Sequence, residues 1–372
     1  MAKRKSPPRK GAARRPNIAS LRREIDAIDT EVIELLNRRA VLAQRVGEAK
    51  SVRGQAMFDP ARQRQILRRL AKRNPGPYPT LSLQRVWTEI MGACLSLEQP
   101  LRVGYLGPES SFSHLAAIHE FGHAMDLRPY VSISDIFHAV EKEHLDCGVV
   151  PIENSTEGIV HFTMDSFLDS PLKICSELLL RIRLSLLAKG TLGKIKRVYS
   201  HPQPFRQCHR WLRENLPQAK LVEVSSTAKG SELAARTSDA ASIGSVVAAE
   251  KYGLKIIAEG IEDDADNTTR FLVISPMHPG PSGDDKTSIM FTLRDKPGAL
   301  VSVLEPLDRK GINMTNIDVR PSRRRAFDYV FFIDLEGHIE ERRVADAIEQ
   351  MHDHCVMVKV LGSYPRQAVR TG

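Results

Sequence analysis

Two cations stand in an otherwise apolar helical stripe near the N-terminus. Arg39 occupies one position of the stripe, and Lys50 lies eleven residues further, about three helical turns away on nearly the same face. These cations can bind an anion in the seam, or their stems can lie along apolar surface with the charged ends in water. The apolar positions recur at steps of three and four and are Ile18, Leu21, Ile25, Ile28, Val32, Leu35, Leu42 and Val46.

Two shorter helices must complete this unit. Asp59-Pro60 is typical of a helix start, and it places Arg62 and Gln63 in the first turn. Residues 74–79 end this helix, and Thr80 is expected to cap a third one that reaches Glu98. Three helices, one of them very long, cannot bury so extended a stripe within one chain. The pattern therefore predicts an intertwined homodimer over residues 17–99.

The stretches LRREIDAIDTEVIELLNRRAVLAQRVGEAK and DPARQRQ resemble the all-helical chorismate mutase family over about residues 18–98. Arg22 and Arg39 are 17 residues apart, about 260° round one helix, so they do not serve one pocket. This fits the family arrangement, in which the residue at the Arg22 position reaches into the partner's site. The resemblance implies that the substrate, chorismate, is bound by Arg22, Arg39, Lys50, Asp59, Arg62 and Gln63.

The chemistry implied by this resemblance needs no acid, nucleophile or cofactor. Chorismate rearranges to prephenate when it is held folded and when charge developing on the breaking ether oxygen is stabilised. Lys50 is our candidate for the principal donor to that oxygen. Glu98 stands where the family often has Gln, and Gln63 stands where it often has Glu. Because a carboxylate would repel the developing charge, we expect Glu98 to act only when protonated.

From residue 101 short apolar strands alternate with helical stretches, which is an α/β pattern over residues 101–276. Ligands in such folds bind beyond strand ends, often between lobes. A Pro/Gly/Ser-rich linker is predicted at 277–285. The predicted strands are 102–106, 147–152, 198–200, 221–224, 241–243 and 271–274.

Four polar loops follow or precede these strands, at 104–113, 150–158, 200–208 and 267–271. Each loop alone is more typical of caps and turns than of a functional site. Together with the STA motif at Ser226-Thr227-Ala228, the GP, ENS, SHPQ and TRF motifs of these loops resemble prephenate dehydratase, a family of two α/β lobes related to periplasmic binding proteins with the site in the cleft. The resemblance implies a site made of Glu153, Asn154, Ser155, Ser200, Gln207, Thr269 and Arg270.

This second reaction expels CO2 and the ring hydroxyl from prephenate to give phenylpyruvate, and aromatisation drives it without a cofactor. Thr269 is expected to polarise the departing hydroxyl, with Glu153 as the source of the proton. Ser200 and Gln207 are expected to anchor the substrate carboxylate. Arg270 either binds substrate or holds a loop or lobe interface. An enzyme acting on arogenate, with the helical unit mainly dimerising, remains an alternative.

Residues 286–363 follow the order βαββαβ, the ferredoxin-like plan, with strands predicted at 287–293, 313–319, 327–335 and 356–361 and helices at 298–310 and 339–352. Lys296-Pro297-Gly298-Ala299-Leu300 and Asp318-Val319-Arg320-Pro321 resemble the ACT regulatory domain. The usual second motif begins Glu-Ser, so effector identity stays open, as does a purely structural dimerisation role. The resemblance implies an effector, typically L-phenylalanine, bound by Gly298, Ala299, Leu300, Asp318, Arg320 and Pro321.

The excess positive charge is concentrated at one end of the 372-residue chain. The formal net charge is +9, of which residues 1–16 supply +7 and residues 17–99 supply +5, whereas the remainder carries −3. We expect the basic tail to be disordered and expect no nucleic-acid partner, although a non-enzymatic sensor using this tail on DNA is an alternative. The five cysteines and twelve histidines form no ligand pattern, so we expect no metal and no disulfide framework. No apolar run of 18 residues occurs, which predicts a cytoplasmic protein without a membrane partner.

Overall fold

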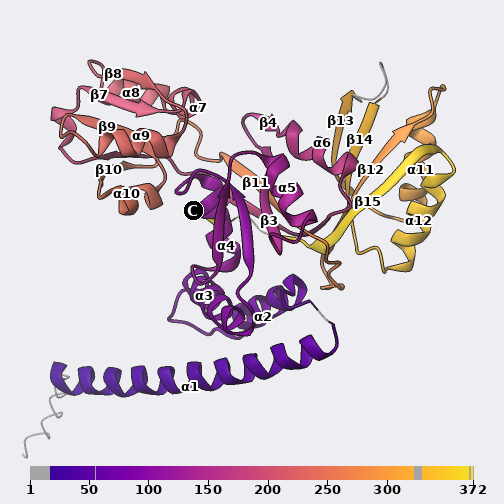
Figure 1. The fold of residues 1–372 in the computed structure, drawn as a ribbon, viewed down its shortest axis with the longest axis horizontal. Helices are drawn as coiled ribbons and strands as arrows, with labels where there is room; N and C mark the ends of the chain where they lie inside the picture. Colours follow the sequence, from indigo (N-terminus) through magenta and orange to yellow (C-terminus); the bar gives the residue numbers. More distant parts are fainter. Residues whose placement is uncertain (1–16, 55, 322–328, 368–369, 372) are drawn as a thin grey trace, which may run out of the picture.

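The computed structural model describes residues 17–54, 56–321, 329–367 and 370–371. It contains a helical unit, a two-lobed α/β unit and a C-terminal α+β unit (Figure 1). The basic tail and the first residues of the strand predicted at 327 lie outside the described residues. Within the described part, no helix is both long enough and apolar enough to cross a membrane.

The helical unit consists of α1 (Ile18–Val52), α2 (Pro60–Arg73) and α3 (Thr80–Glu98). Asp59 caps α2 as predicted, because its carboxylate accepts from the Arg62 amide at 2.9 Å. Asn17 caps α1, and Thr80 is the first helical residue of α3 instead of its cap, which shifts that helix start by one residue. The helices themselves are as predicted.

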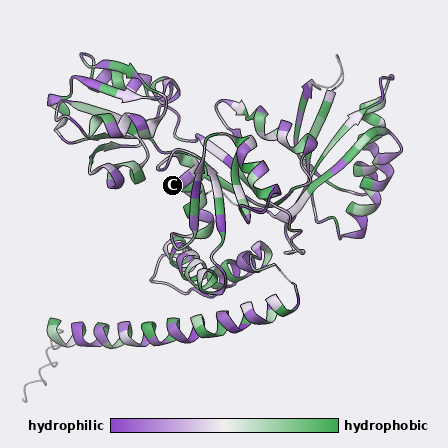
Figure 2. Ribbon diagram, in the orientation of Figure 1, coloured by the Kyte–Doolittle hydropathy of each residue, from purple (hydrophilic) through white to green (hydrophobic). Residues whose placement is uncertain are grey.

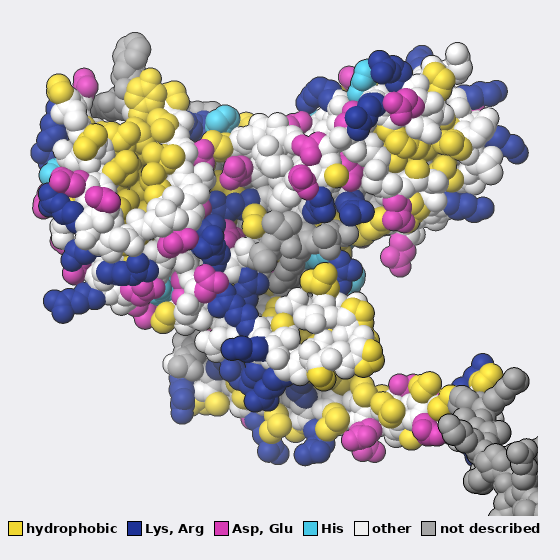
Figure 3. Space-filling view, turned by 180° about the vertical axis from the view of Figure 1, so that it is seen from behind, with side chains coloured by type: hydrophobic (Ala, Val, Ile, Leu, Met, Phe, Trp, Pro, Cys, Tyr) yellow, Lys and Arg dark blue, Asp and Glu magenta, His cyan; other side chains and the backbone are white. Residues whose placement is uncertain are grey.

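Most of α1 stands apart from the rest of the chain. It has 35 residues and is therefore about 50 Å long. It meets α3 at Arg39 and Gly47, in its C-terminal half. Ile25, Ile28 and Leu42 are 55%, 58% and 58% exposed. Apolar and polar side chains alternate along the free helix (Figures 2 and 3). So long an apolar stripe in water calls for a partner surface.

The first lobe of the α/β unit is built on a seven-stranded sheet with the order β16-β5-β11-β3-β1-β2, with β4 paired to β3. β1 pairs in parallel with β2 and β3, whereas β11 is antiparallel to both β3 and β5. Its strands are β1 (Arg102–Leu106), β2 (Asp126–Tyr130), β3 (Cys147–Asn154), β4 (Gly158–Ile159), β5 (Lys173–Arg181), β11 (Thr268–Ser275) and β16 (Arg370–Thr371). Its helices are α4 (Phe112–Phe121), α5 (Ile133–Glu141) and α6 (His161–Asp169).

The second lobe has a five-stranded sheet with the order β10-β6-β9-β7-β8. The chain enters this lobe after β5 and returns into β11, so residues at those two crossings lie between the lobes. The strands are β6 (Ser185–Ala188), β7 (Arg197–Ser200), β8 (Lys220–Glu223), β9 (Ala240–Gly244) and β10 (Lys255–Glu259). The helices are η1 (Leu192–Lys194), α7 (Pro202–Gln207), α8 (His209–Asn215), α9 (Thr227–Ala234) and α10 (Val246–Tyr252).

The C-terminal unit has the predicted βαββαβ order, with four antiparallel strands ordered β13-β14-β12-β15. Its last strand runs past the predicted end, and the chain then adds β16 to the first lobe beside β5. The described residues beyond 363 therefore continue the C-terminal sheet to Pro365 and then join the first lobe at Arg370–Thr371. The elements are β12 (Asp285–Leu293), α11 (Ala299–Arg309), β13 (Met314–Pro321), β14 (Tyr329–Glu336), α12 (Arg342–His352) and β15 (Cys355–Pro365).

Continuous hydrophobic cores join the units. One cluster includes Phe58 of the helical unit with Val103 and Phe121 of the first lobe. A second cluster joins Phe167 of the first lobe to Phe332 of the C-terminal unit. Because burial of shared apolar surface resists separation, the sites described below keep fixed positions relative to one another. All five cysteines are free and buried.

Candidate functional sites

A pocket opens between α1, α2 and α3. Six residues predicted to bind or act on an anionic substrate line it together: Arg39, Lys50, Asp59, Arg62, Gln63 and Glu98. Arg39 donates to the Cys94 Sγ at 2.8 Å, and the Lys50 Nζ donates to the Met57 carbonyl at 2.8 Å. Both cations are thus held by protein groups at the pocket wall, which favours an anion-binding role over stems lying passively on the surface.

Glu98 is the acid of this pocket. Burial raises the pKa of Glu98 above its ordinary value, and the nearby Lys50 and Arg39 only partly offset that rise. The end of α3 approaches α1 closely at Gly47. A Cβ at this position would lie 2.9 Å from the Glu98 Cβ and Cγ atoms, so the approach depends on glycine. The close approach therefore encloses Glu98 and produces its raised pKa.

Arg22 does not line this pocket. It lies on the free part of α1, about 25 Å from Arg39 along the helix axis. This placement agrees with the expectation that the two arginines cannot serve one pocket of the same chain.

A second polar site lies where β3 and β11 end beside the crossing to the second lobe. Asn154 and Thr269 face each other in the ladder, and the Asn154 amide nitrogen donates to the Thr269 Oγ1 at 2.8 Å and to the Asn267 Oδ1 at 2.9 Å. The side-chain oxygen of Asn154, Oδ1, accepts from the backbone amides of Thr156 and Glu157. Because Asn154 supplies a donor to Thr269, the hydroxyl hydrogen of Thr269 remains available for another acceptor.

Loops from both lobes meet around this pair. Gln207 of α7 approaches the Thr156 hydroxyl at 3.4 Å, and Arg206 pairs with Glu157 at 3.4 Å. The Ser155 hydroxyl accepts from the Thr268 amide at 2.9 Å. The structure thus brings four of the predicted residues to one place, namely Asn154, Ser155, Gln207 and Thr269.

Ser200 is placed differently from the expectation. It is fully buried at the end of β7, and its hydroxyl donates to the Ile243 carbonyl at 3.2 Å. The expected contact with a substrate carboxylate is therefore corrected, because this hydroxyl binds β9 inside the second lobe.

Glu153 and Arg270 lie on the opposite face of the sheet from Asn154 and Thr269. They oppose each other in the β3–β11 ladder, and neighbouring residues of a strand point to opposite faces. Burial raises the pKa of Glu153, and the nearby Arg270 lowers it less. The expectation that Glu153 hands a proton to Thr269 is corrected, since the sheet separates the two side chains.

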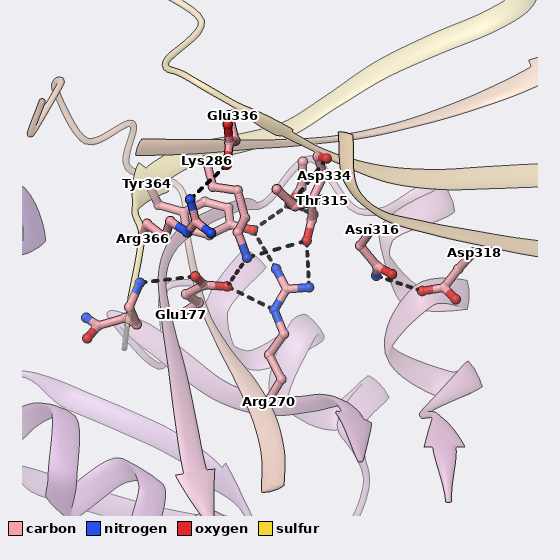
Figure 4. A network of polar contacts seen from close by, with 12 residues as sticks. Glu177, Arg270, Lys286, Thr315, Asn316, Asp318, Asp334, Glu336, Tyr364 and Arg366 are labelled. Carbon is pink, nitrogen blue, oxygen red and sulfur yellow. Dashed lines mark hydrogen bonds and ion pairs between the residues drawn. The ribbon is translucent and has the colours of Figure 1, made fainter. Parts of the chain in front are cut away.

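Arg270 is the centre of a buried cluster of charges (Figure 4). Its guanidinium pairs with Glu177 of β5 at 2.9 Å and with Asp334 of β14 at 2.7 Å, and it donates to the Tyr364 hydroxyl at 2.9 Å. Lys286 of β12 also pairs with Glu177, at 3.0 Å. Burial alone would lower the pKa of Arg270, but Tyr364, Asp334 and Glu177 raise it well above its ordinary value.

This cluster corrects the expectation of direct substrate binding by Arg270 in favour of the interface role. Each side of the junction contributes one cation and one anion, namely Arg270 and Glu177 from the first lobe and Lys286 and Asp334 from the C-terminal unit. The cluster is therefore formally neutral. Sequence reasoning missed Glu177, Lys286 and Asp334. The available signal is a lone charge inside an apolar strand, as in CSELLL and FFIDLE, because such a charge must find a buried partner.

The predicted effector segments occupy different surroundings in the C-terminal unit. Gly298 precedes α11 with a φ of +78°, which suits glycine, and Ala299 and Leu300 follow in the helix. Arg320, one residue before Pro321 at the end of β13, pairs with Asp165 of α6 at 2.6 Å. Asp318 is half-buried, and burial raises its pKa. The second segment therefore docks on the first lobe.

Comparisons with known proteins match all three units. The chorismate mutase type II family model matches residues 21–99, the prephenate dehydratase model matches residues 103–279, and the ACT domain model matches residues 287–353.

Individual proteins match either nearly the whole chain or about 71% of it. A bifunctional chorismate mutase/prephenate dehydratase of Aquifex aeolicus is 45% identical over 94% of this chain and 98% of the relative. A solved prephenate dehydratase of Arthrobacter aurescens, in complex with L-Phe, is 34% identical over 71% of this chain and 90% of its own, with a TM-score of 0.65. The Staphylococcus aureus prephenate dehydratase is 28% identical over 71% of this chain and all of its own, with a TM-score of 0.63.

Proposed function

The chain belongs to the bifunctional chorismate mutase/prephenate dehydratase family and has both activities, and from this premise we propose how its residues divide the two reactions. The helical pocket converts chorismate to prephenate, and the cleft of the two-lobed unit converts prephenate to phenylpyruvate. The observation that carries the assignment is the meeting of Arg39, Lys50, Arg62 and Glu98 in one pocket.

In the mutase pocket the cations bind the two substrate carboxylates and fold the molecule for rearrangement. Lys50 and protonated Glu98 donate to the ether oxygen while its bond to carbon breaks. Asp59 acts mainly through the cap of α2, which orients Arg62. Gln63 remains free to present one amide hydrogen and its carbonyl oxygen to the substrate.

In the dehydratase cleft Thr269 donates its hydrogen toward the departing ring hydroxyl. The ring C–O bond and the bond to the carboxylate break together, so that water and CO2 leave and the ring becomes aromatic. Asn154 orients Thr269, since it occupies an acceptor position of the hydroxyl oxygen. Ser155 and Gln207 hold the substrate where the two lobes meet, and solvent supplies the proton that restores Thr269.

The C-terminal unit is an ACT domain, and we propose that it inhibits the dehydratase when L-phenylalanine binds. The Arthrobacter relative was crystallised with L-Phe, which supports this effector. Gly298, Ala299, Leu300, Asp318, Arg320 and Pro321 are the proposed effector residues. The signal has a short physical route, because Asp334 of the ACT sheet pairs with Arg270, the neighbour of Thr269 in β11.

A second copy of the chain is the proposed partner of the exposed face of α1. The free part of this helix carries both the apolar stripe and Arg22, which is remote from its own pocket. A homodimer covers the stripe and delivers Arg22 to the partner's mutase site.

Five buried free cysteines fit a reducing compartment, which supports a cytoplasmic location.

The division of labour predicts separable activities. Wild-type protein fed with chorismate should form phenylpyruvate, whereas Thr269→Ala should accumulate prephenate and lose at least ~100-fold in dehydratase turnover. Thr269→Ser keeps a hydroxyl and should retain a large part of the activity. Phenylpyruvate formation by Thr269→Ala at the wild-type rate would contradict the role of Thr269. Separately, if the wild-type protein turns over arogenate faster than prephenate, arogenate is the preferred substrate.

The raised pKa of Glu98 predicts the pH dependence of the mutase. Glu98 donates a hydrogen only when protonated, so mutase activity should fall as the pH rises through this raised pKa. Glu98→Gln keeps a donor at every pH and should remove this fall. Glu214→Gln, at an exposed position of α8 in the second lobe, should keep the wild-type profile. Superimposable pH–rate profiles for wild type and Glu98→Gln would refute the proposal.

The dimer proposal predicts that a charge in the stripe separates the protomers. Ile28→Asp places a carboxylate in an apolar seam, which costs several kcal/mol and should weaken the dimer more than ~100-fold. Thr30→Asp adds the same charge on the opposite side of α1 and should leave the dimer intact. Light scattering after size-exclusion chromatography measures the mass, and a dimeric Ile28→Asp would argue against this seam.

A further inference from the structure

We propose that the dehydratase domain supplies one wall of the mutase pocket, through the C-terminal end of α4. This inference rests on the proposed mutase site and deepens it. Glu120 and Phe121, the last two residues of α4, line the pocket together with the residues of α1, α2 and α3. They belong to the first lobe of the dehydratase and lie outside the part of the chain that matches the mutase family.

The apolar part of this wall is a ring pair. Phe58, which directly precedes the cap of α2, packs against Phe121 with ring centroids 4.9 Å apart. Phe121 is 2% exposed and Phe58 is 9% exposed, so each ring excludes water from the other. Phe58 sits beside Asp59 and thereby sets the position from which α2 presents Arg62. Phe121 therefore positions the start of α2.

The polar part of the wall orients Gln63. The Gln63 amide nitrogen donates to the Glu120 carbonyl at 3.1 Å. Only the NH2 group of the side chain can donate, so this bond fixes which way the amide faces and leaves one hydrogen and the carbonyl oxygen for the substrate. A carbonyl of the dehydratase domain thus sets the orientation of a mutase pocket residue.

The wall is closely fitted to α3 as well. A Cβ at Gly92 would overlap the Phe121 carbonyl oxygen, so only glycine permits this approach. The Glu89 carboxylate, one turn before Gly92, accepts from the His123 amide at 3.1 Å. Contacts from α2 and α3 therefore both hold the end of α4 in place.

The opposite end of α4 lies where the first lobe contacts the second. Ser111 caps α4 within the first dehydratase motif, and Ser245 of the second lobe donates to the neighbouring Ser110 carbonyl at 3.0 Å. The helix has ten residues and is about 15 Å long. One short helix thus reaches from the mutase pocket to a contact between the two lobes, and Phe121 acts as a positioning residue for chorismate binding.

The test compares Phe121→Ala with Phe137→Ala in the full-length protein. Phe137 is as deeply buried in the same lobe but packs on Phe167, away from the mutase pocket. Phe121→Ala should raise the mutase KM for chorismate about tenfold, equivalent to ~1.4 kcal/mol of binding, with a smaller change in kcat. Phe137→Ala should leave that KM unchanged. Thermal unfolding and prephenate turnover show whether each variant is folded.

A second variant keeps the test decisive if Phe121→Ala does not fold. Gly92→Ala pushes α4 away from the mutase side and should raise the same KM, and the double variant should show less than the combined effect. An unchanged KM in Gly92→Ala or in folded Phe121→Ala overturns the inference. Lys50→Met tests the pocket assignment by itself. If Lys50→Met loses mutase activity while Phe121→Ala keeps the wild-type KM, the pocket assignment stands and only the role of α4 as its wall is refuted.

Discussion

Four charged side chains with almost no access to water determine how the ACT domain meets the dehydratase. Arg270 and Lys286 pair with Glu177 and Asp334 at the junction of two sheets. A buried charge is tolerated only when it is paired, and removal of one partner from such a group costs about 3–5 kcal/mol. The two sheets therefore keep one relative position. Because Arg270 and Thr269 are neighbours in β11, this position also sets the geometry of the dehydratase site.

Neither reaction requires a strong acid or a cofactor, and both sites consist of groups whose donors are held in advance. In the mutase pocket, burial raises the pKa of Glu98 although two nearby cations oppose the rise, which favours the protonated form that can donate. In the dehydratase cleft, the Asn154 amide leaves the Thr269 hydroxyl free to donate. The C-terminal end of α4, in the first lobe of the dehydratase, lines the mutase pocket, so the joining of the two domains has a structural consequence beyond the sharing of a product.

The sequence predicted most of the helical pocket because its residues lie on regular helices, where spacing determines the face. Arg39, Lys50 and Glu98 meet as expected. The dehydratase motifs were harder to interpret. Predicting a strand only from Phe271 left Thr269 and Arg270 in a loop, whereas β11 begins at Thr268 and sends the two side chains to opposite faces. The partners of Arg270 are up to 94 residues away, and a lone charge in an apolar strand indicates that a partner is needed without showing which residue it is.

The central claim is that the Arg270 cluster connects the effector site to Thr269. The most direct measurement is the inhibition of prephenate turnover by L-phenylalanine in wild type and in Asp334→Asn, expressed as the ratio of activity with and without effector in the same sample. If the Arg270 cluster carries the signal, L-phenylalanine inhibits the wild type, and Asp334→Asn shows a marked rise in the half-inhibitory concentration. Identical inhibition curves, or a wild-type enzyme unaffected by millimolar L-phenylalanine, would contradict it.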